Sequence, residues 1–222
     1  MKAMILAAGK GERLMPLTKN TPKPLIKVRG KALIEHSIEA LKKAGVHDII
    51  INTAYLGEQI QTHLGDGTKF GICIHYSIEK TALETAGGII KALPVLGNTP
   101  FIVMNADVLC DYDLSTLTLP NDSLAHLLLV DNPKHNLNGD FALANGRIIY
   151  PNNTQTYTFS GIGLYHPSFF QSELSNDGKL ALSSLFKEAI NKGQLTGEHY
   201  SGDWHDIGTA ERLQLVNETI LE

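Results

Sequence analysis

The chain has 222 residues, a formal net charge of −4, and 43% hydrophobic and 19% charged residues. These values are typical of an ordinary globular protein that buries its own core, and the acidic balance argues against a nucleic-acid partner. The cysteines, Cys73 and Cys110, are too few for a disulfide framework, and the apolar stretch from Met4 to Ala8 is too short for a signal or transmembrane segment. We therefore expect a cytoplasmic protein with no membrane partner.

The first half of the chain alternates strand-like apolar runs with helix-like spacing, which predicts an α/β fold with a mainly parallel sheet. We expect strands at 1–8, 48–53, 72–77 and 101–105, and helices at 33–44, 56–64 and about 84–92. Beyond about residue 120 the pattern is looser, with strands expected at 123–130, 147–150 and 158–165 and helices at about 181–192 and 210–220. The sequence contains no repeat or linker-like tract, so it predicts one compact domain with two functional halves.

A glycine-rich loop, Gly9-Lys10-Gly11-Glu12-Arg13, directly follows the first expected strand. Glycines let the backbone approach a ligand, and successive N–H groups form an anion-binding concavity. Leu14 stands where a dinucleotide fingerprint needs its third glycine, and the spacing does not match a P-loop. The loop therefore predicts a phosphate site of another kind, with a glycine-rich turn that binds no ligand as the alternative.

Cationic side chains accompany this loop. Lys10 and Arg13 lie inside it, and Lys23 follows between two prolines at residues 22 and 24. The prolines disfavour helix on either side, so we expect Lys23 in extended chain, on a rigid mount suited to a charge directed at a triphosphate. The alternative is a solvated surface lysine.

Two acidic segments could hold a metal ion. Asp107 follows the strand-like run 101–105, at the carboxyl end of a strand, where ligands collect in open α/β sheets. A carboxylate there commonly holds Mg²⁺ against phosphate oxygens, although capping of the next helix is an equally good reading. Far along the chain, Asp203 and Asp206 could both ligate metal, with Thr209 capping the last helix. We expect His205 to be structural, since phosphoryl transfer depends on positioning and charge more than on a base.

These segments together resemble the signature motifs of sugar-1-phosphate nucleotidyltransferases. The run 6–18 with Pro22-Lys23-Pro24-Leu25 is similar to the opening motif of that family. Asn105-Ala106-Asp107 looks like its first metal-binding segment, and Trp204-His205-Asp206-Ile207-Gly208-Thr209 like its second. The matches occur in family order and span nearly the whole chain.

The resemblance implies a Rossmann-like, GT-A-like fold, with a mixed, mainly parallel sheet flanked by helices. It implies a single domain at 1–222, with a nucleotide-binding half at about 1–110 and a sugar-binding half at about 111–222. The catalytic residues would be Arg13 and Lys23, and Mg²⁺ would be held by Asp107 and Asp206. The residues expected to bind the nucleotide are Ala8, Gly9, Gly11, Glu12, Arg13, Leu83, Glu84, Thr85, Gly88 and Asn105. Those expected to bind the sugar are Asn138, Gly139, Asp140, Ser160 and Gly161.

Two segments, 83–88 and 158–162, look most like those of family members that transfer uridylate to N-acetylmuramic acid 1-phosphate in peptidoglycan recycling. We therefore expect UTP and this sugar phosphate as substrates, in a monomer or small homo-oligomer. GTP with mannose 1-phosphate is the main alternative, and a non-catalytic nucleotide-binding regulator is the second. One departure concerns the acceptor: many relatives contact the sugar phosphate through a Glu-Lys-Pro segment, and Tyr150-Pro151-Asn152-Asn153 occupies the corresponding region here.

Overall fold

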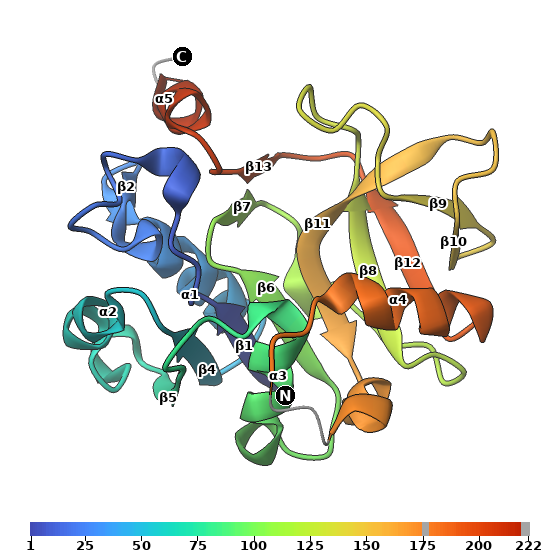
Figure 1. The fold of residues 1–222 in the computed structure, drawn as a ribbon, viewed down its shortest axis with the longest axis horizontal. Helices are drawn as coiled ribbons and strands as arrows, with labels where there is room; N and C mark the ends of the chain where they lie inside the picture. The colour runs from blue at the N-terminus through green and yellow to red at the C-terminus, as the bar shows by residue number, and fades with distance from the viewer. Residues whose placement is uncertain (175–177, 219–222) are drawn as a thin grey trace.

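The computed structural model describes residues 1–174 and 178–218. The protein contains a nine-stranded mixed sheet that is flanked by helices (Figure 1). The strands are β1 (Lys2–Leu6), β2 (Lys27–Val28), β3 (Lys31–Ala32), β4 (Asp48–Thr53), β5 (Cys73–Ile78), β6 (Phe101–Asn105), β7 (Val108–Cys110), β8 (Ala125–Val130), β9 (Phe141–Ala144), β10 (Arg147–Ile149), β11 (Thr156–Tyr165), β12 (Leu195–Tyr200) and β13 (Trp204–Asp206). The helices are α1 (Leu33–Lys43), α2 (Gly57–Leu64), α3 (Glu84–Leu96), α4 (Leu182–Asn191) and α5 (Ala210–Glu218).

The order of strands in the large sheet locates the functional edge. The order is β5-β4-β1-β6-β11-β8-β12-β10-β9, in which β5, β4, β1 and β6 are parallel and β11 runs against β6. The chain leaves β1 toward β4 and β5 and then returns to place β6 on the other side of β1. In open α/β sheets such a reversal opens a crevice beyond the carboxyl ends of the strands, where ligands bind. Here that crevice lies beyond Leu6 and Asn105, which are paired in register.

Successive side chains of β1 point to opposite faces of the sheet and join two different hydrophobic clusters. Ala3 and Ile5 point to the face covered by α1 and α2, whereas Met4 packs with the apolar residues of α3 and α4 on the other face. Both faces are buried, as expected for a sheet covered by helices, and this makes β1 continuously apolar. The ends of β1 and β6 are thereby held rigidly, which suits a site that must aim charges.

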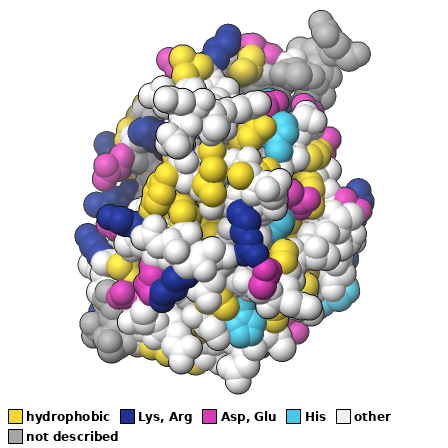
Figure 2. All heavy atoms as spheres, turned by 90° about the vertical axis from the view of Figure 1, so that its right-hand side faces the viewer, with side chains coloured by type: hydrophobic (Ala, Val, Ile, Leu, Met, Phe, Trp, Pro, Cys, Tyr) yellow, Lys and Arg dark blue, Asp and Glu magenta, His cyan; other side chains and the backbone are white. Residues whose placement is uncertain are grey.

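The looser second half completes the same sheet. β12 pairs in parallel with β8, and β10 pairs antiparallel with both β12 and β9. Figure 2 shows the face of the molecule at this end, where lysine and arginine side chains lie beside aspartate and glutamate, with hydrophobic side chains between them. Within the described part of the chain, no helix has the length and apolar character needed to cross a membrane.

Most expected elements are present, with three differences. The helix expected at about 84–92 continues to Leu96, and Pro94 lies inside its last turn. The sequence pattern does not predict the strands β2, β3, β7, β9, β12 and β13, and residues 219–220 of the last expected helix lie outside the described residues. The prediction that Lys23 lies in extended chain is wrong: Lys23–Leu25 is a short 3₁₀ turn that follows the extended Pro22. Pro24 fits there because the first turn of a helix leaves its N–H groups unbonded in any case.

Candidate active site

The glycine loop and the first acidic segment meet at the crevice beyond β1 and β6. The Ala106 N–H donates to Leu6 O at 3.1 Å, which ties the chain after β6 to the end of β1. A cavity of about 180 Å³ opens here, lined by Gly9, Lys23, Asn105 and Asp107 among others. Segments that are distant in sequence therefore share one small pocket, as the motifs predict.

Gly11 holds the loop against Lys23. Its φ of 65° lies in the left-handed region, and a Cβ at this position would stand 2.9 Å from both Lys23 Cβ and Thr18 Cγ2. The Thr18 hydroxyl donates to Gly11 O at 2.8 Å and fixes the turn. Along the loop, the amides of Ala8 and Gly9 donate to no other group within the described residues. Unpaired backbone donors beside a lysine are what an anionic ligand requires.

The two acidic segments come together through a short antiparallel ribbon, β7 and β13. Asp206 is paired in register with Val108, and the Ile207 N–H donates to Asp107 O at 2.9 Å. Asp107 and Asp206 are thus neighbours, although almost a hundred residues separate them in sequence. The ribbon thus brings the backbone of the second acidic segment next to that of the first, and a metal ion shared by their carboxylates stays a prediction.

Each of these carboxylates is paired with a cation. Lys23 Nζ forms an ion pair with Asp107, and both side chains are largely buried. Arg212 Nη1 lies 2.5 and 2.6 Å from the two carboxylate oxygens of Asp206. Arg13 lies close by: a Cβ at Gly208 would stand 3.3 Å from Arg13 Nη2. The side chains of Asp107 and Asp206 are about three-quarters buried, and carboxylates on adjoining segments next to unpaired backbone donors have the chemistry that Mg²⁺ and phosphate oxygens require.

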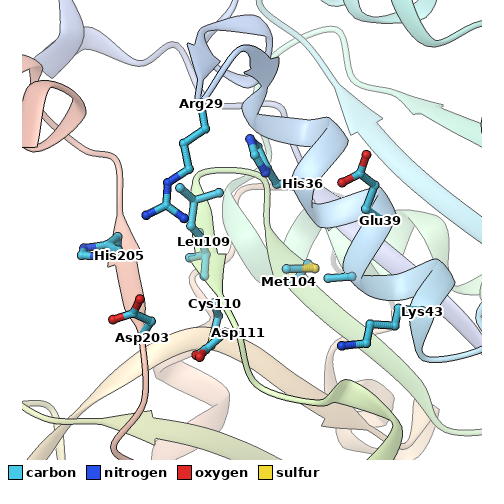
Figure 3. A pocket seen from close by; sticks show the side chains of 12 residues that line it. Arg29, His36, Glu39, Lys43, Met104, Leu109, Cys110, Asp111, Asp203 and His205 are labelled. Atoms are coloured by element: carbon cyan, nitrogen blue, oxygen red, sulfur yellow. The ribbon is translucent and has the colours of Figure 1, made fainter. Parts of the chain in front are cut away.

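The other side of the same ribbon faces a different pocket, of about 280 Å³ (Figure 3). Asp203 and His205 lie on this side, next to α1 and Arg29. Asp203 lines this pocket, whereas Asp107 lines the pocket at the glycine loop and Asp206 is paired with Arg212. Burial, reinforced by Asp111 and Asp203, raises the pKa of the Cys110 thiol to about 11. This thiol stays protonated at neutral pH and is not a nucleophile.

A buried polar chain connects the glycine loop to the segment expected to read the base. The Ala7 N–H donates to Asn52 Oδ1 at 2.8 Å, Asn52 Nδ2 donates to Glu79 Oε1 at 2.8 Å, and Glu79 Oε2 accepts the Leu83 N–H at 2.9 Å. Asn52 and Glu79 are each 3% exposed, so they hold the backbone at both ends without reaching solvent. Glu84 follows with a φ of 62°, an unusual conformation for a residue with a side chain and one that clusters at functional sites.

The segments expected to bind the sugar flank the same crevice. Gly161 has a φ of 81°, and a Cβ there would lie 2.6 Å from Asn105 Nδ2, so β11 approaches the first acidic segment closely. The Trp204 indole N–H donates to Ser160 O at 2.9 Å, while the Ser160 side chain itself is buried. In the loop before β9, Asp140 Oδ2 accepts the Phe159 N–H at 2.8 Å.

Of the remaining predicted residues, Glu12 and Asn138 are exposed, and Gly139 adopts a left-handed φ of 62°. The Gly88 Cα faces the Asn52–Glu79 pair, since a Cβ there would be 2.8 Å from each. Contacts of these residues with nucleotide or sugar stay predictions.

Four residues at the site were not anticipated: Asn52, Glu79, His135 and Arg212. Their roles come from contacts across the chain, so no local motif indicates them. Arg212 carried one weak signal, since it lies in the first turn of the helix that follows the second acidic segment.

Comparison with known proteins points to the family that the sequence motifs resemble. The nucleotidyl transferase family model matches residues 2–222. An N-acetylmuramate alpha-1-phosphate uridylyltransferase from Neisseria meningitidis is 47% identical over 96% of this chain and 96% of its own length. A mannose-1-phosphate guanyltransferase from Neurospora crassa is 33% identical over 94% of this chain and 61% of its own length. Among solved structures, a Bacillus anthracis protein assigned as a glucose-1-phosphate thymidylyltransferase, in complex with a sucrose, has a TM-score of 0.85, with 30% identity over 99% of this chain and 94% of that chain.

Proposed function

The chain belongs to the nucleotidyl transferase family, and we propose that it transfers uridylate from UTP to N-acetylmuramic acid 1-phosphate with release of pyrophosphate. It is a sugar-1-phosphate nucleotidyltransferase. The observation that carries the proposal is the ion pair of Lys23 with Asp107 in the pocket at the glycine loop, beside the ribbon that carries Asp206. That junction supplies what phosphoryl transfer between two polyanions needs, namely positioned charge in a small crevice.

In this reaction an oxygen of the sugar 1-phosphate attacks the α-phosphorus of the nucleotide, and the bond to the pyrophosphate oxygen breaks. The attacking oxygen is already anionic, so no side chain has to remove a proton. The difficulty is electrostatic, because two polyanions must approach and charge accumulates at the α-phosphate. Lys23, held by Gly11 on one side and Asp107 on the other, is placed to stabilise that charge, and Arg13 adds a second cation.

The residues fit a divalent cation. Asp107 and Asp206 would hold Mg²⁺, which supplies charge neutralisation and orientation of the phosphate oxygens when it is bound. The free amides of Ala8 and Gly9 would cradle the triphosphate, and the rigid segment from Glu79 to Gly88 would receive the base and ribose. We further propose that the nucleotide occupies the half at about 1–110 and the sugar the half at about 111–222. In the sheet, β6 belongs to the first half and its antiparallel neighbour β11 to the second, so the two halves adjoin next to the crevice.

The similarity to the meningococcal uridylyltransferase over nearly all of both chains supports UTP and the muramic acceptor over GTP and mannose 1-phosphate. The reaction would then serve the reuse of peptidoglycan sugars in the cytoplasm. The direct test is magnesium-dependent pyrophosphate release, with four nucleoside triphosphates crossed against the 1-phosphates of N-acetylmuramic acid, N-acetylglucosamine, glucose and mannose. Turnover restricted to UTP and the muramic substrate is the expected result. Turnover restricted to GTP and mannose 1-phosphate would reject the substrates, and folded protein that binds nucleotide without any turnover would reject the activity.

A further inference from the structure

Arg212 makes contacts beyond its ion pair with Asp206. Its side chain is 17% exposed, and Nη1 lies 2.5 and 2.6 Å from the Asp206 oxygens. The same nitrogen lies 2.7 Å from His135 Nε2, in the loop that leads to β9. Arg212 therefore contacts both the metal-binding carboxylate and the loop proposed to hold the sugar.

Cationic groups outnumber carboxylates around this point. A Cβ at Gly208 would stand 2.1 Å from Arg212 Nη2 and 3.3 Å from Arg13 Nη2, so two guanidinium groups converge there. With Lys23, these are three cations facing the carboxylates of Asp107 and Asp206. A divalent cation held by the oxygens of Asp206 would take the carboxylate partner of Arg212, whose side chain is only 17% exposed and would keep His135 alone. A guanidinium in that position requires another anion, and phosphate suits its fork of N–H donors.

Besides Arg212, the cationic residues of the sugar half are Lys134, Arg147, Lys179, Lys187 and Lys192, and of these Lys134 is an exposed lysine next to His135. Between Arg147 and Lys179 the chain contains no lysine or arginine at all, which includes the whole of β11 and the region of Tyr150. Arg147 is paired with Asp122 at the far edge of the sheet, and Lys192 with Glu188 on α4. Arg212, by contrast, contacts Asp206 and His135 and approaches Gly208 together with Arg13 of the glycine loop.

We propose that Arg212 binds the phosphate of the sugar 1-phosphate, to which it turns when a divalent cation occupies Asp206. The proposal rests on the function proposed above. Arg13 and Lys23 serve the triphosphate, whereas Arg212 serves the acceptor. His135 is a positioning residue, since it holds the guanidinium between the loop and the carboxylate. Asp206 therefore has two successive partners, and the protein without substrate keeps the carboxylate neutralised by the arginine that later binds substrate.

The test separates the two substrates. In Arg212→Gln we expect the KM for N-acetylmuramic acid 1-phosphate to rise at least about tenfold, the usual effect of losing one charge-assisted hydrogen bond, while the KM for UTP stays within about twofold. Calorimetric titration of N-acetylmuramic acid 1-phosphate into enzyme with Mg²⁺ and a non-hydrolysable UTP analogue should show the same loss of affinity. Arg212→Lys, which keeps the charge but not the fork, should recover part of it.

Arg147→Gln is the matched control, because it removes another arginine that is paired with an aspartate but lies away from the crevice. It should leave both KM values unchanged, and thermal unfolding confirms that each variant is folded. If Arg212→Gln does not fold, Arg212→Lys takes its place, and its KM for N-acetylmuramic acid 1-phosphate should rise more than its KM for UTP. An unchanged acceptor KM in an active Arg212 variant, or a rise in the UTP KM of equal size, would overturn this proposal alone. Absence of turnover in the wild-type protein would instead overturn the function on which it rests.

Discussion

Gly11→Ala tests whether the glycine loop positions Lys23. An alanine at a φ of 65° adopts the left-handed conformation at a cost of about 1–2 kcal/mol. In addition, its Cβ would meet Lys23 Cβ and the methyl group of the buried Thr18, each at 2.9 Å. Neither atom is the free end of a flexible side chain, so the backbone has to move, at a further cost of about 1–3 kcal/mol. The expected loss in the free energy of unfolding is about 2–5 kcal/mol.

Gly45→Ala isolates the backbone contribution, because Gly45 has a φ of 79° with nothing within 4 Å of a Cβ. It should cost about 1–2 kcal/mol in urea unfolding and leave turnover unchanged. Gly11→Ala should also reduce turnover, by at least about tenfold, since misplacement of a charge by about 1 Å can cost about a hundredfold in rate. Equal unfolding free energies for the two variants, with normal turnover in Gly11→Ala, would refute the reasoning.

Other predictions concern charge and protonation. Lys23→Ala should lower turnover by about 10²–10³, the usual effect of losing one well-aimed charge, and normal turnover in this folded variant would remove Lys23 from the mechanism. Because burial raises the pKa of Cys110 to about 11, iodoacetamide at pH 8 should label the exposed Cys73 first, and mass spectrometry that finds Cys110 labelled as fast would contradict this. Burial lowers the pKa of His126 from its ordinary 6.5, despite the opposing effect of Glu198. The unfolded chain then takes up a proton that the folded chain resists, so the free energy of unfolding should fall as the pH drops below about 6.5. His126→Gln should flatten that dependence, and an unchanged slope would show that another group causes it.

The sequence predicts those strands and helices whose residue pattern lies within the element itself. The continuous apolar runs of β1 and β6 and the helical spacing in α1 indicate their elements directly, and the residues that follow each run indicate the crevice. Local patterns fail for β7 and β13, which have three residues each and form because they pair with one another. The prediction of extended chain at Lys23 is wrong for a different reason: prolines disfavour the interior of a helix, but a proline fits the first turn, as Pro24 does here.

The site shows the same division. Asp107 and Asp206 could each be selected from their surroundings in sequence, yet their proximity depends on the register of the ribbon between them. Asn52, Glu79 and Arg212 carry no motif, because each acts through a hydrogen bond or ion pair with a residue from another element. Residues that bind a ligand through the backbone are easier to anticipate than residues that hold another side chain in place.

We propose that Asp107 and Asp206 form one metal centre for nucleotidyl transfer. The measurement that tests it most directly is the magnesium dependence of pyrophosphate release, with UTP and N-acetylmuramic acid 1-phosphate, for Asp107→Asn, Asp206→Asn and the double variant. Each single variant should lose about 10²–10³ in turnover, and the double variant should be little worse than either, because residues that act as a unit are not additive. Asp203→Asn, three residues away but lining the other pocket, should stay active. Independent losses that multiply in the double variant, or inactivation by Asp203→Asn alone, would contradict the account.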